Sequence, residues 1–460
     1  MLYIKNGTII NPEENRLYPA DIWIEDGKIS KISERATKQA VKDGAEAVVE
    51  CSSGSDAGVA GECILDGGVQ TVAGIEAEVE TIDASGMFIA PGLADVHVHF
   101  RDPGFTYKED IFTGAAAAAA GGYTEIVLMA NTKPSVDNEE TLAYVLSKGK
   151  ETGIHIGTCV NVTKSMAGKE LVDMELLAER GAAGFTDDGI PIMDEVLVKQ
   201  AMEKAAELKK PISFHEEDPT LITNNGVNAG KASAFYGIGG SPREAEISLV
   251  ERDLKLAIKT GADVVIQHIS SGEAVELVRK AKAAGANVHA EGTPHHFTLT
   301  EEAVISKGTL AKMNPPLREE ADRLAVIQGL KDGTIDMIAT DHAPHSAEEK
   351  ARAITEAPSG IIGLETALSL GIRELVQKGY LTWPELIHRM STAPCRLYGL
   401  DGGTVREGGC ASLVLFDPEE VWKVESFASK AENSPFIGEE LPGVVHYTIC
   451  DGEIVYKRER

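Results

Sequence analysis

Eight short apolar segments, separated by stretches of helical periodicity, limit most strongly how this 460-residue chain can fold. Strands that alternate with helices form a parallel sheet. Eight such units over about 300 residues predict a closed (β/α)8 barrel of the TIM type. The predicted strands cover residues 92–100, 123–131, 155–162, 182–188, 211–217, 262–270, 287–296 and 335–342.

An open, doubly wound sheet is the alternative fold. It would need a glycine-rich phosphate loop after its first strand. The sequence GAAAAAAGG at residues 114–122 stands near that place, but we interpret it as a tightly packed helix and its stop. The barrel is therefore the fold that we expect.

The two ends of the chain have the same sequence pattern. Residues 20–33 and 444–457 each contain two alternating runs around an Asp-Gly turn, which is a strong hairpin signal. With the apolar runs at 2–10 and 411–418, they predict one small composite β-sandwich domain built from both termini. The fold class is thus α/β, with a barrel and a β-domain.

We place the composite β-domain at residues 1–90 and 395–460 and the barrel at 91–394. Residues 37–80 do not fit this division, because they are rich in Gly, Ala, Ser and Glu and have few large apolar residues. We expect an atypical insertion that is mobile in part, with an extra hairpin possible at 63–72. No function is assigned to it.

Charge and composition limit the partners. The chain has 44 basic and 72 acidic residues and a net charge of −28, which repels nucleic acid and anionic membranes. No apolar run approaches the roughly 20 residues of a membrane span, and the start lacks the core of a signal peptide. We expect a cytoplasmic protein. Its six cysteines form no C-x-x-C pair and are interpreted as reduced thiols, most of them packing residues.

Metal-ligand residues stand at the ends of the predicted strands, where barrel enzymes place their active sites. A single such residue is more often a hydrogen-bonded core or surface group. Five strand ends together, in a chain with only 12 histidines, indicate a hydrolytic metal centre. The residues are His97 and His99, Asp187 and Asp188, His215, His268, and Asp341.

This ligand set is large enough for two Zn²⁺ ions that share a bridging ligand and keep positions open for water. A hydroxide held between two divalent ions is a nucleophile at neutral pH, and one ion also polarises the attacked carbonyl. Asp341 could take the proton of the water and pass it to the departing nitrogen. His97, His99 and Arg101 occupy alternate positions, so on a strand they would share one face.

Nine motifs identify a family resemblance. They are DVHVHFRDPGFTYKEDI, NTKPSVDN, GFTDDG, FHEED, IQHISS, TPHHFTLTEE, KMNPPLR, ATDHAPH and GIIGLETAL, in this order. With them the chain resembles the cyclic amidohydrolase branch of the amidohydrolase superfamily, and within it the class I bacterial dihydroorotases, over nearly its whole length. The resemblance implies reversible cyclisation of N-carbamoyl-L-aspartate to dihydroorotate, a step of pyrimidine synthesis, by attack of a metal-bound hydroxide.

The resemblance also implies which residues hold the metals. His97, His99 and Asp341 would hold one ion, His215 and His268 the other, with Asp188 as the bridge. Asp187 is kept as a lesser candidate for the bridge. Hydantoinases and allantoinases, the nearest rival activities, use a carboxylated lysine there, and residues 181–189 contain no lysine.

The substrate residues rest on the same resemblance. Arg101 would bind the free carboxylate of dihydroorotate, for which a planar guanidinium is the natural partner. Asn131 and His345 would complete the clamp, and Asn314 would lie beside the ring. From the residues alone, a surface ion pair of Arg101 and a turn asparagine are the simpler interpretations.

Some residues near the motifs leave alternatives open. His295 and His296 follow a strand and could support either the ligands or the fold. The polar segment 345–360 could close over a bound ring or be an ordinary solvated loop. Glu216 stands where a small residue is common in the family, and Ser359 is extra beside the expected Pro-Gly, so fine specificity is open.

The family resemblance implies a homodimer and an association with aspartate carbamoyltransferase. It also leaves a rival of another class, a catalytically silent scaffold. Such a scaffold would have lost ligands, and none is lost here.

Overall fold

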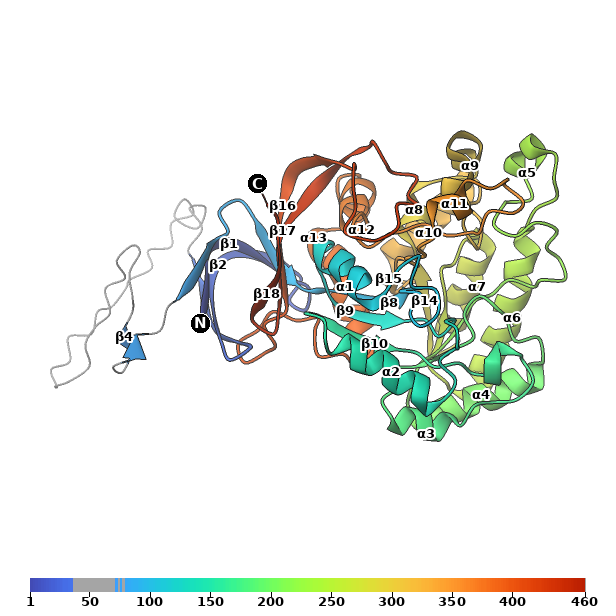
Figure 1. The fold of residues 1–460 in the computed structure, drawn as a ribbon, viewed down its shortest axis with the longest axis horizontal. Coiled ribbons are helices and arrows are strands. Elements are labelled where there is room, and N and C mark those ends of the chain that lie inside the picture. The colour runs from blue at the N-terminus through green and yellow to red at the C-terminus, as the bar shows by residue number, and fades with distance from the viewer. Residues whose placement is uncertain (36–70, 73–74, 77–78, 460) are drawn as a thin grey trace.

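The computed structural model describes residues 1–35, 71–72, 75–76 and 79–459. Its larger part is a ring of short parallel strands surrounded by helices (Figure 1). The strands are β8 (Leu93–Val98), β9 (Tyr123–Leu128), β10 (His155–Thr158), β11 (Phe185–Thr186), β12 (Ile212–Phe214), β13 (Val264–Ile266), β14 (Val288–Gly292) and β15 (Met337–Ile338).

The ring is closed. Parallel pairing runs from β8 to β10 and from β11 to β15, and two single parallel bridges join these runs, Val160 with Phe185 and Val98 with His342. Each predicted segment contains one of the eight strands. The barrel prediction is therefore confirmed over the open sheet.

Helices cover the outside of the ring, and most follow a strand. They are α1 (Ile111–Ala120), α2 (Glu139–Gly149), α3 (Met174–Glu179), α4 (Glu195–Leu208), α5 (Lys231–Tyr236), α6 (Arg243–Thr260), α7 (Gly272–Ala283), α8 (Pro294–Thr298), α9 (Glu302–Lys307), α10 (Glu320–Asp332), α11 (Ala347–Lys350), α12 (Ala367–Gly371), α13 (Trp383–Ile387) and α14 (Ala393–Tyr398). Short 3₁₀ turns lie at Lys164–Met166 and Gly308–Ala311, and π-helical turns follow α12 at Ile372–Val376 and α13 at His388–Thr392.

The alanine-rich segment forms α1, as predicted. The side chain of Asp110 caps its first turn by accepting from the Phe112 and Thr113 N–H groups, and Gly121 ends it. Gly114 faces Phe100 so closely that a Cβ there would lie 2.3 Å from the ring. Small side chains thus let α1 pack directly against the segment that leaves β8.

The two chain ends build one mixed sheet beside the barrel (Figure 1). It joins β1 (Leu2–Asn11), β2 (Arg16–Glu25), β3 (Lys28–Glu34), β6 (Glu80–Asp83), β7 (Phe88–Pro91), β16 (Leu413–Lys423), β17 (Glu440–Cys450) and β18 (Glu453–Lys457). Both predicted hairpins are present, β2–β3 and β17–β18. β7 pairs with β16, and this pairing makes the sheet composite.

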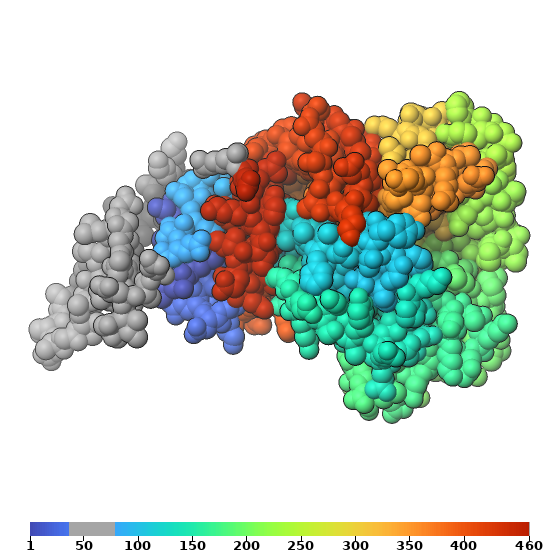
Figure 2. Space-filling view, in the orientation of Figure 1, coloured from blue at the N-terminus to red at the C-terminus, as the bar shows by residue number. Residues whose placement is uncertain are grey.

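The C-terminal strands lie between the N-terminal strands and the barrel (Figure 2). The sheet has its own buried core, with Ile4, Ile22, Ile89, Leu413 and Ile449 among its members. The two domain boundaries, at 90/91 and 394/395, remain our proposal. The boundary at 394/395 falls within α14.

Two local predictions about strands are corrected. The segment 287–296 is a strand only to Gly292, because Thr293 caps a helix with Pro294 in its first turn, and α8 then carries His295 and His296. β8 ends at Val98, and Arg101 has a left-handed φ of 60°. The alternation of side chains along a strand therefore does not determine the direction of the Arg101 side chain.

Most of residues 37–80 lies outside the described residues, including nearly all of the hairpin considered at 63–72. Two short strands there pair antiparallel, β4 (Thr71–Val72) with β5 (Ile75–Glu76). Among the described residues, no helix combines the length and the apolar character needed to cross a membrane.

Candidate metal centre and active site

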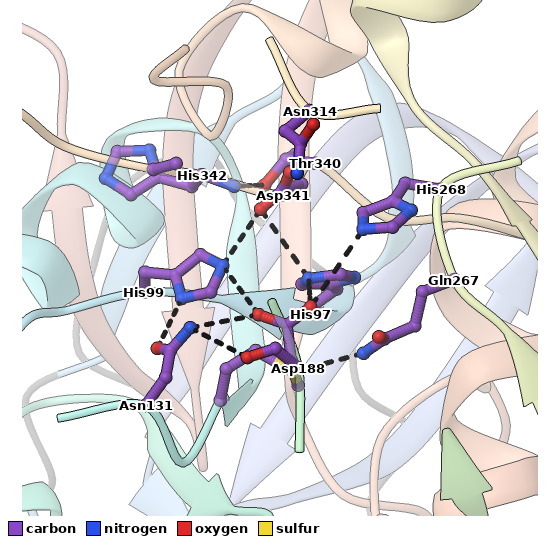
Figure 3. A network of polar contacts seen from close by, with 12 residues as sticks. His97, His99, Asn131, Asp188, Gln267, His268, Asn314, Thr340, Asp341 and His342 are labelled. Atoms are coloured by element: carbon purple, nitrogen blue, oxygen red, sulfur yellow. Dashed lines mark hydrogen bonds and ion pairs between the residues drawn. The ribbon is translucent and has the colours of Figure 1, made fainter. Parts of the chain in front are cut away.

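Histidine and aspartate side chains converge at the carboxyl ends of the barrel strands (Figure 3). Five of them line a cavity of about 270 Å³, namely His99, Asp188, His215, His268 and Asp341. The structure brings together all six predicted ligands, in groups whose ligand atoms lie within 4.8 Å of one another. The groups are His97, His99 and Asp188; His97, His268 and Asp341; and Asp188, His215 and His268.

Asp188 and Asp341 face the histidines from opposite strands. Asp341 Oδ1 lies 2.9 Å from His99 Nε2 and 3.5 Å from His97 Nε2. Asp188 Oδ1 lies 3.4 Å from His97 Nε2, and its Oδ2 lies 3.5 Å from His99 Nε2. Asp188 also reaches the second pair, because Oδ1 is 3.9 Å from His215 Nδ1 and from His268 Nε2.

The donor atoms of these side chains fit a cation. His97 Nε2 is buried and has no hydrogen-bond partner although it points at two carboxylates. His215 Nδ1 and His268 Nε2 face each other at 2.9 Å. Imidazole nitrogens together with two carboxylates are the ligands that a divalent metal takes in a hydrolytic site.

The charges point to the same conclusion. Burial opposes a charge on His97, but Glu291, Asp188 and Asp341 outweigh it and raise the pKa of His97 well above its ordinary value. Burial, with His215 and His97 nearby, lowers the pKa of His268 well below its ordinary value. The site therefore favours a positive charge between the carboxylates and a neutral imidazole at His268. A divalent cation would supply that charge in place of the His97 proton.

Supporting groups orient the histidines. His97 Nδ1 donates to Glu291 Oε2 at 2.8 Å, and His99 Nδ1 donates to Asn131 Oδ1 at 3.0 Å. In both rings Nε2 is left facing the aspartates. A carboxylate or carbonyl on the far nitrogen is the usual support of a metal-binding histidine. Glu291 was missed by the sequence analysis, although it stands at the end of β14.

Three of the residues left open have structural contacts. Asp187 turns away from the cavity, since Oδ1 accepts from the Val162 and Thr163 N–H groups and Oδ2 from the Thr163 hydroxyl. His296 is held between the Thr293 hydroxyl and the Pro315 carbonyl. His295 is buried beside it, with ring centroids 4.6 Å apart.

The four predicted substrate residues all line the cavity. The Arg101 Nε donates to the Pro344 carbonyl at 3.3 Å, which fixes the plane of the guanidinium. Asn131 donates to Asp188 Oδ2 at 3.1 Å, so it contacts the candidate ligands as well as the cavity. Asn314 Nδ2 lies 3.2 Å from His215 Nε2.

His345 is held neutral beside Arg101. Its Nε2 donates to the Ser359 carbonyl at 2.9 Å, and Lys108 donates to its Nδ1 at 3.3 Å. Burial and the charges of Arg101 and Lys108 lower the pKa of His345.

Two buried lysines hold the segment 345–360, and the sequence analysis did not single them out. Lys312 Nζ donates to the carbonyls of Ile354 and Ala357, and Lys350 Nζ donates to those of Pro358 and Gly360. Burial lowers the pKa of Lys350 to about 7. The segment is therefore tied to the rim of the cavity by its backbone.

Comparisons with known proteins agree with this geometry. A family model described as dihydro-orotase-like matches residues 86–274. A protein named dihydroorotase from Clostridioides difficile is 53% identical over 456 residues, 99% of this chain and 100% of the relative. One of the same name from Clostridium acetobutylicum is 48% identical over 459 residues, with the same coverage.

Solved structures extend the likeness in fold. L-hydantoinase from Arthrobacter aurescens superimposes with a TM-score of 0.81 at 23% identity, over 100% of this chain and 96% of its own. D-hydantoinase from a Thermus species gives 0.77 at 24% identity, over 100% and 97%. These structures show the fold. The full-length relatives named dihydroorotase make the chain a cyclic amidohydrolase, and the paired His and Asp groups agree with that class. Within that class, the full-length relatives show that the chain belongs to the dihydroorotase family.

The Glu291–His97 contact generates a prediction. Replacing Glu291 by Gln removes the charge that holds the His97 Nδ1 proton, so metal affinity should fall about 10- to 100-fold. Competition with a chromophoric chelator measures this. The control is Glu301→Gln, since Glu301 is equally buried but accepts from Asn228 and Ala232. If Glu291→Gln binds the metal as tightly as Glu301→Gln does, the supporting role of Glu291 is contradicted.

Proposed function

We propose that this chain interconverts N-carbamoyl-L-aspartate and dihydroorotate at a centre of two zinc ions. The likeness over the whole chain to proteins named dihydroorotase supports the reaction. The observation that carries the proposal is a single cavity in which an oriented guanidinium, Arg101, faces the His and Asp cluster. This is the combination that a cyclic amide with a free carboxylate requires.

In this proposal all six predicted ligands hold the ions, and Asp341 has a second role as proton carrier. His97, His99 and Asp341 would hold one ion, His215 and His268 would hold the other, and Asp188 would be shared by both. The bridge is supported by the position of Asp188, whose Oδ1 lies 3.4 Å from His97 Nε2 and 3.9 Å from His268 Nε2. When bound, the ions would supply a nucleophile at neutral pH and polarise the amide carbonyl.

Asp341 is the proton carrier of the proposal. Its Oδ1 contacts His99 and His97, and Asp341 lines the cavity, so its carboxylate is in reach of a substrate bound there. In the hydrolytic direction it accepts the proton of the attacking water. The ring C–N bond then breaks, and the same proton passes to the departing nitrogen. Cyclisation runs these steps in reverse and releases water.

Arg101, Asn131, Asn314 and His345 bind the substrate in this proposal. A guanidinium held at Nε by the Pro344 carbonyl presents its remaining N–H groups in a fixed plane, which suits a carboxylate. His345 is neutral and occupied on both nitrogens, so we assign to it the positioning of Arg101 and of the ring.

The family resemblance supports the remaining parts of the proposal. They are a cytoplasmic location, a homodimer, and an association with aspartate carbamoyltransferase. The net charge of −28 agrees with an enzyme of small substrates that does not bind nucleic acid.

A substrate panel tests the activity. The purified chain is assayed with dihydroorotate, hydantoin and allantoin, before chelation, after it, and after zinc is restored. We expect turnover of dihydroorotate alone, lost on chelation and regained with zinc. Preference for hydantoin or allantoin would assign a rival activity, and turnover of none by the zinc-loaded chain would indicate the silent scaffold.

The carboxylate clamp is tested by Arg101→Met. Removal of a charge-assisted contact should lower kcat/KM for dihydroorotate by at least about 100-fold, while zinc content stays unchanged. Arg352→Met, at an exposed position on the neighbouring segment, should keep full activity. Unchanged turnover in Arg101→Met would refute the clamp.

The bridge is tested by a pair of neighbouring isosteric changes. Asp188→Asn should lower bound zinc from two ions per chain to one or fewer. Asp187→Asn should keep the zinc and lower the melting temperature, because it weakens the contacts with Val162 and Thr163. Metal analysis and thermal unfolding measure the two effects, and a loss of zinc confined to Asp187→Asn would place the bridge there.

A further inference from the structure

A second group of metal-ligand side chains lies away from the active site, where the start of β10 meets the turn between β17 and β18. His155, Cys450 and Asp451 each offer a ligand atom within 4.8 Å of the others. His155 belongs to the barrel, whereas Cys450 and Asp451 belong to the composite sheet. The group therefore spans the contact between the two parts of the chain.

A second thiol lies next to this group and contacts one of its members, Asp451. The Cys410 thiol contacts Asp451 Oδ1 at 2.9 Å and Ser412 Oγ at 3.1 Å. Ser412 Oγ in turn lies 3.8 Å from Cys450 Sγ. The backbone fixes this arrangement, because the Gly452 N–H donates to the Ala411 carbonyl at 3.0 Å. Both cysteines are free thiols.

His155 is oriented as a metal-binding histidine is. Its Nδ1 donates to Glu125 Oε1 at 2.6 Å, and Glu125 is buried, with 3% of its surface exposed. Its Nε2 faces Asp451 Oδ2 at 2.8 Å. A buried carboxylate on the far nitrogen fixes the ring and leaves the other nitrogen for a cation.

We propose that His155, Cys450 and Asp451, with the adjacent Cys410 as fourth ligand, form a structural binding site for a zinc-like divalent ion that joins the composite sheet to the barrel. One imidazole nitrogen, two sulfurs and one carboxylate oxygen make a four-ligand set of the kind that Zn²⁺ takes in closed sites. On binding, the ion replaces the proton between His155 and Asp451 and the protons of the two thiols, which are released to solvent.

The two thiols make the site distinguishable from the active centre, whose candidate ligands are all nitrogen and oxygen. Thiolate ligands give bound Co²⁺ an intense charge-transfer absorption in the near ultraviolet, which imidazole and carboxylate ligands do not give. The full chain is stripped of metal, kept reduced with a phosphine, and titrated with Co²⁺. We expect this band in the wild type and its loss when Zn²⁺ is added.

Matched variants assign the band. Cys450→Ala should abolish it and lower saturating Co²⁺ by one ion per chain. Cys159→Ala should leave both unchanged, because Cys159 is a buried thiol inside the barrel core. A Cys450→Ala variant with wild-type band and metal content would overturn the proposal, and so would a wild type without the band.

A measurement on the unaltered chain covers the case in which Cys450→Ala does not fold. Alkylation of each cysteine is followed by mass spectrometry with and without Zn²⁺. We expect Zn²⁺ to slow alkylation of Cys410 and Cys450 at least about tenfold and to leave Cys395 unaffected; equal rates would refute the site. Because dihydroorotate turnover does not enter this readout, its outcome is independent of the proposed activity.

Discussion

The bridge between the end of β8 and the residue after Asp341 is the contact on which the site depends. Val98 pairs with His342, and the His99 N–H donates to the His342 carbonyl at 2.9 Å. This closure brings Asp341 to within 2.9 Å of His99 across more than half of the chain. In an open, doubly wound sheet the first strand lies inside the sheet and the last at an edge, so the two would not be neighbours and this metal centre could not form between them.

Closure of the barrel also buries charged side chains, and the site residues compensate one another's charges. Carboxylates and imidazoles are taken out of water together, which is costly unless opposite charges compensate. Asp188 and Asp341 attract positive charge, while Glu291 and Asn131 hold the far nitrogens of His97 and His99. The site is therefore built in two layers, the atoms that face the cavity and the atoms that fix them.

Periodicity was sufficient to predict the barrel and both terminal hairpins, because strand length, helix spacing and Asp-Gly turns are local properties. The clustering of the ligands followed from the fold, since parallel strands end at one face. The choice between Asp187 and Asp188 did not follow, because it depends on which carboxylate finds the N–H groups of Val162 and Thr163.

Other features depend on contacts that no local pattern contains. Arg101 reaches the cavity through a left-handed backbone after β8, whereas the pattern placed it by strand alternation. The role of Lys312 is set by carbonyls more than 40 residues away. Likewise, His155 and Cys450 meet only because the β17–β18 hairpin packs on the barrel, so neither was distinguishable from an ordinary core residue.

The pairing of β7 with β16 has a consequence for how the chain is made. The N-terminal strands leave the ribosome first, but their partner edge is supplied by residues that follow the whole barrel. At translation rates of about 5–20 residues per second, the edge of β7 waits roughly 15 to 60 seconds for β16. During that time it is an unpaired apolar strand edge, the kind of surface that invites association with other chains. Assembly of the sheet thus has to follow synthesis of the whole barrel, and until then the open edge of β7 favours association with other chains.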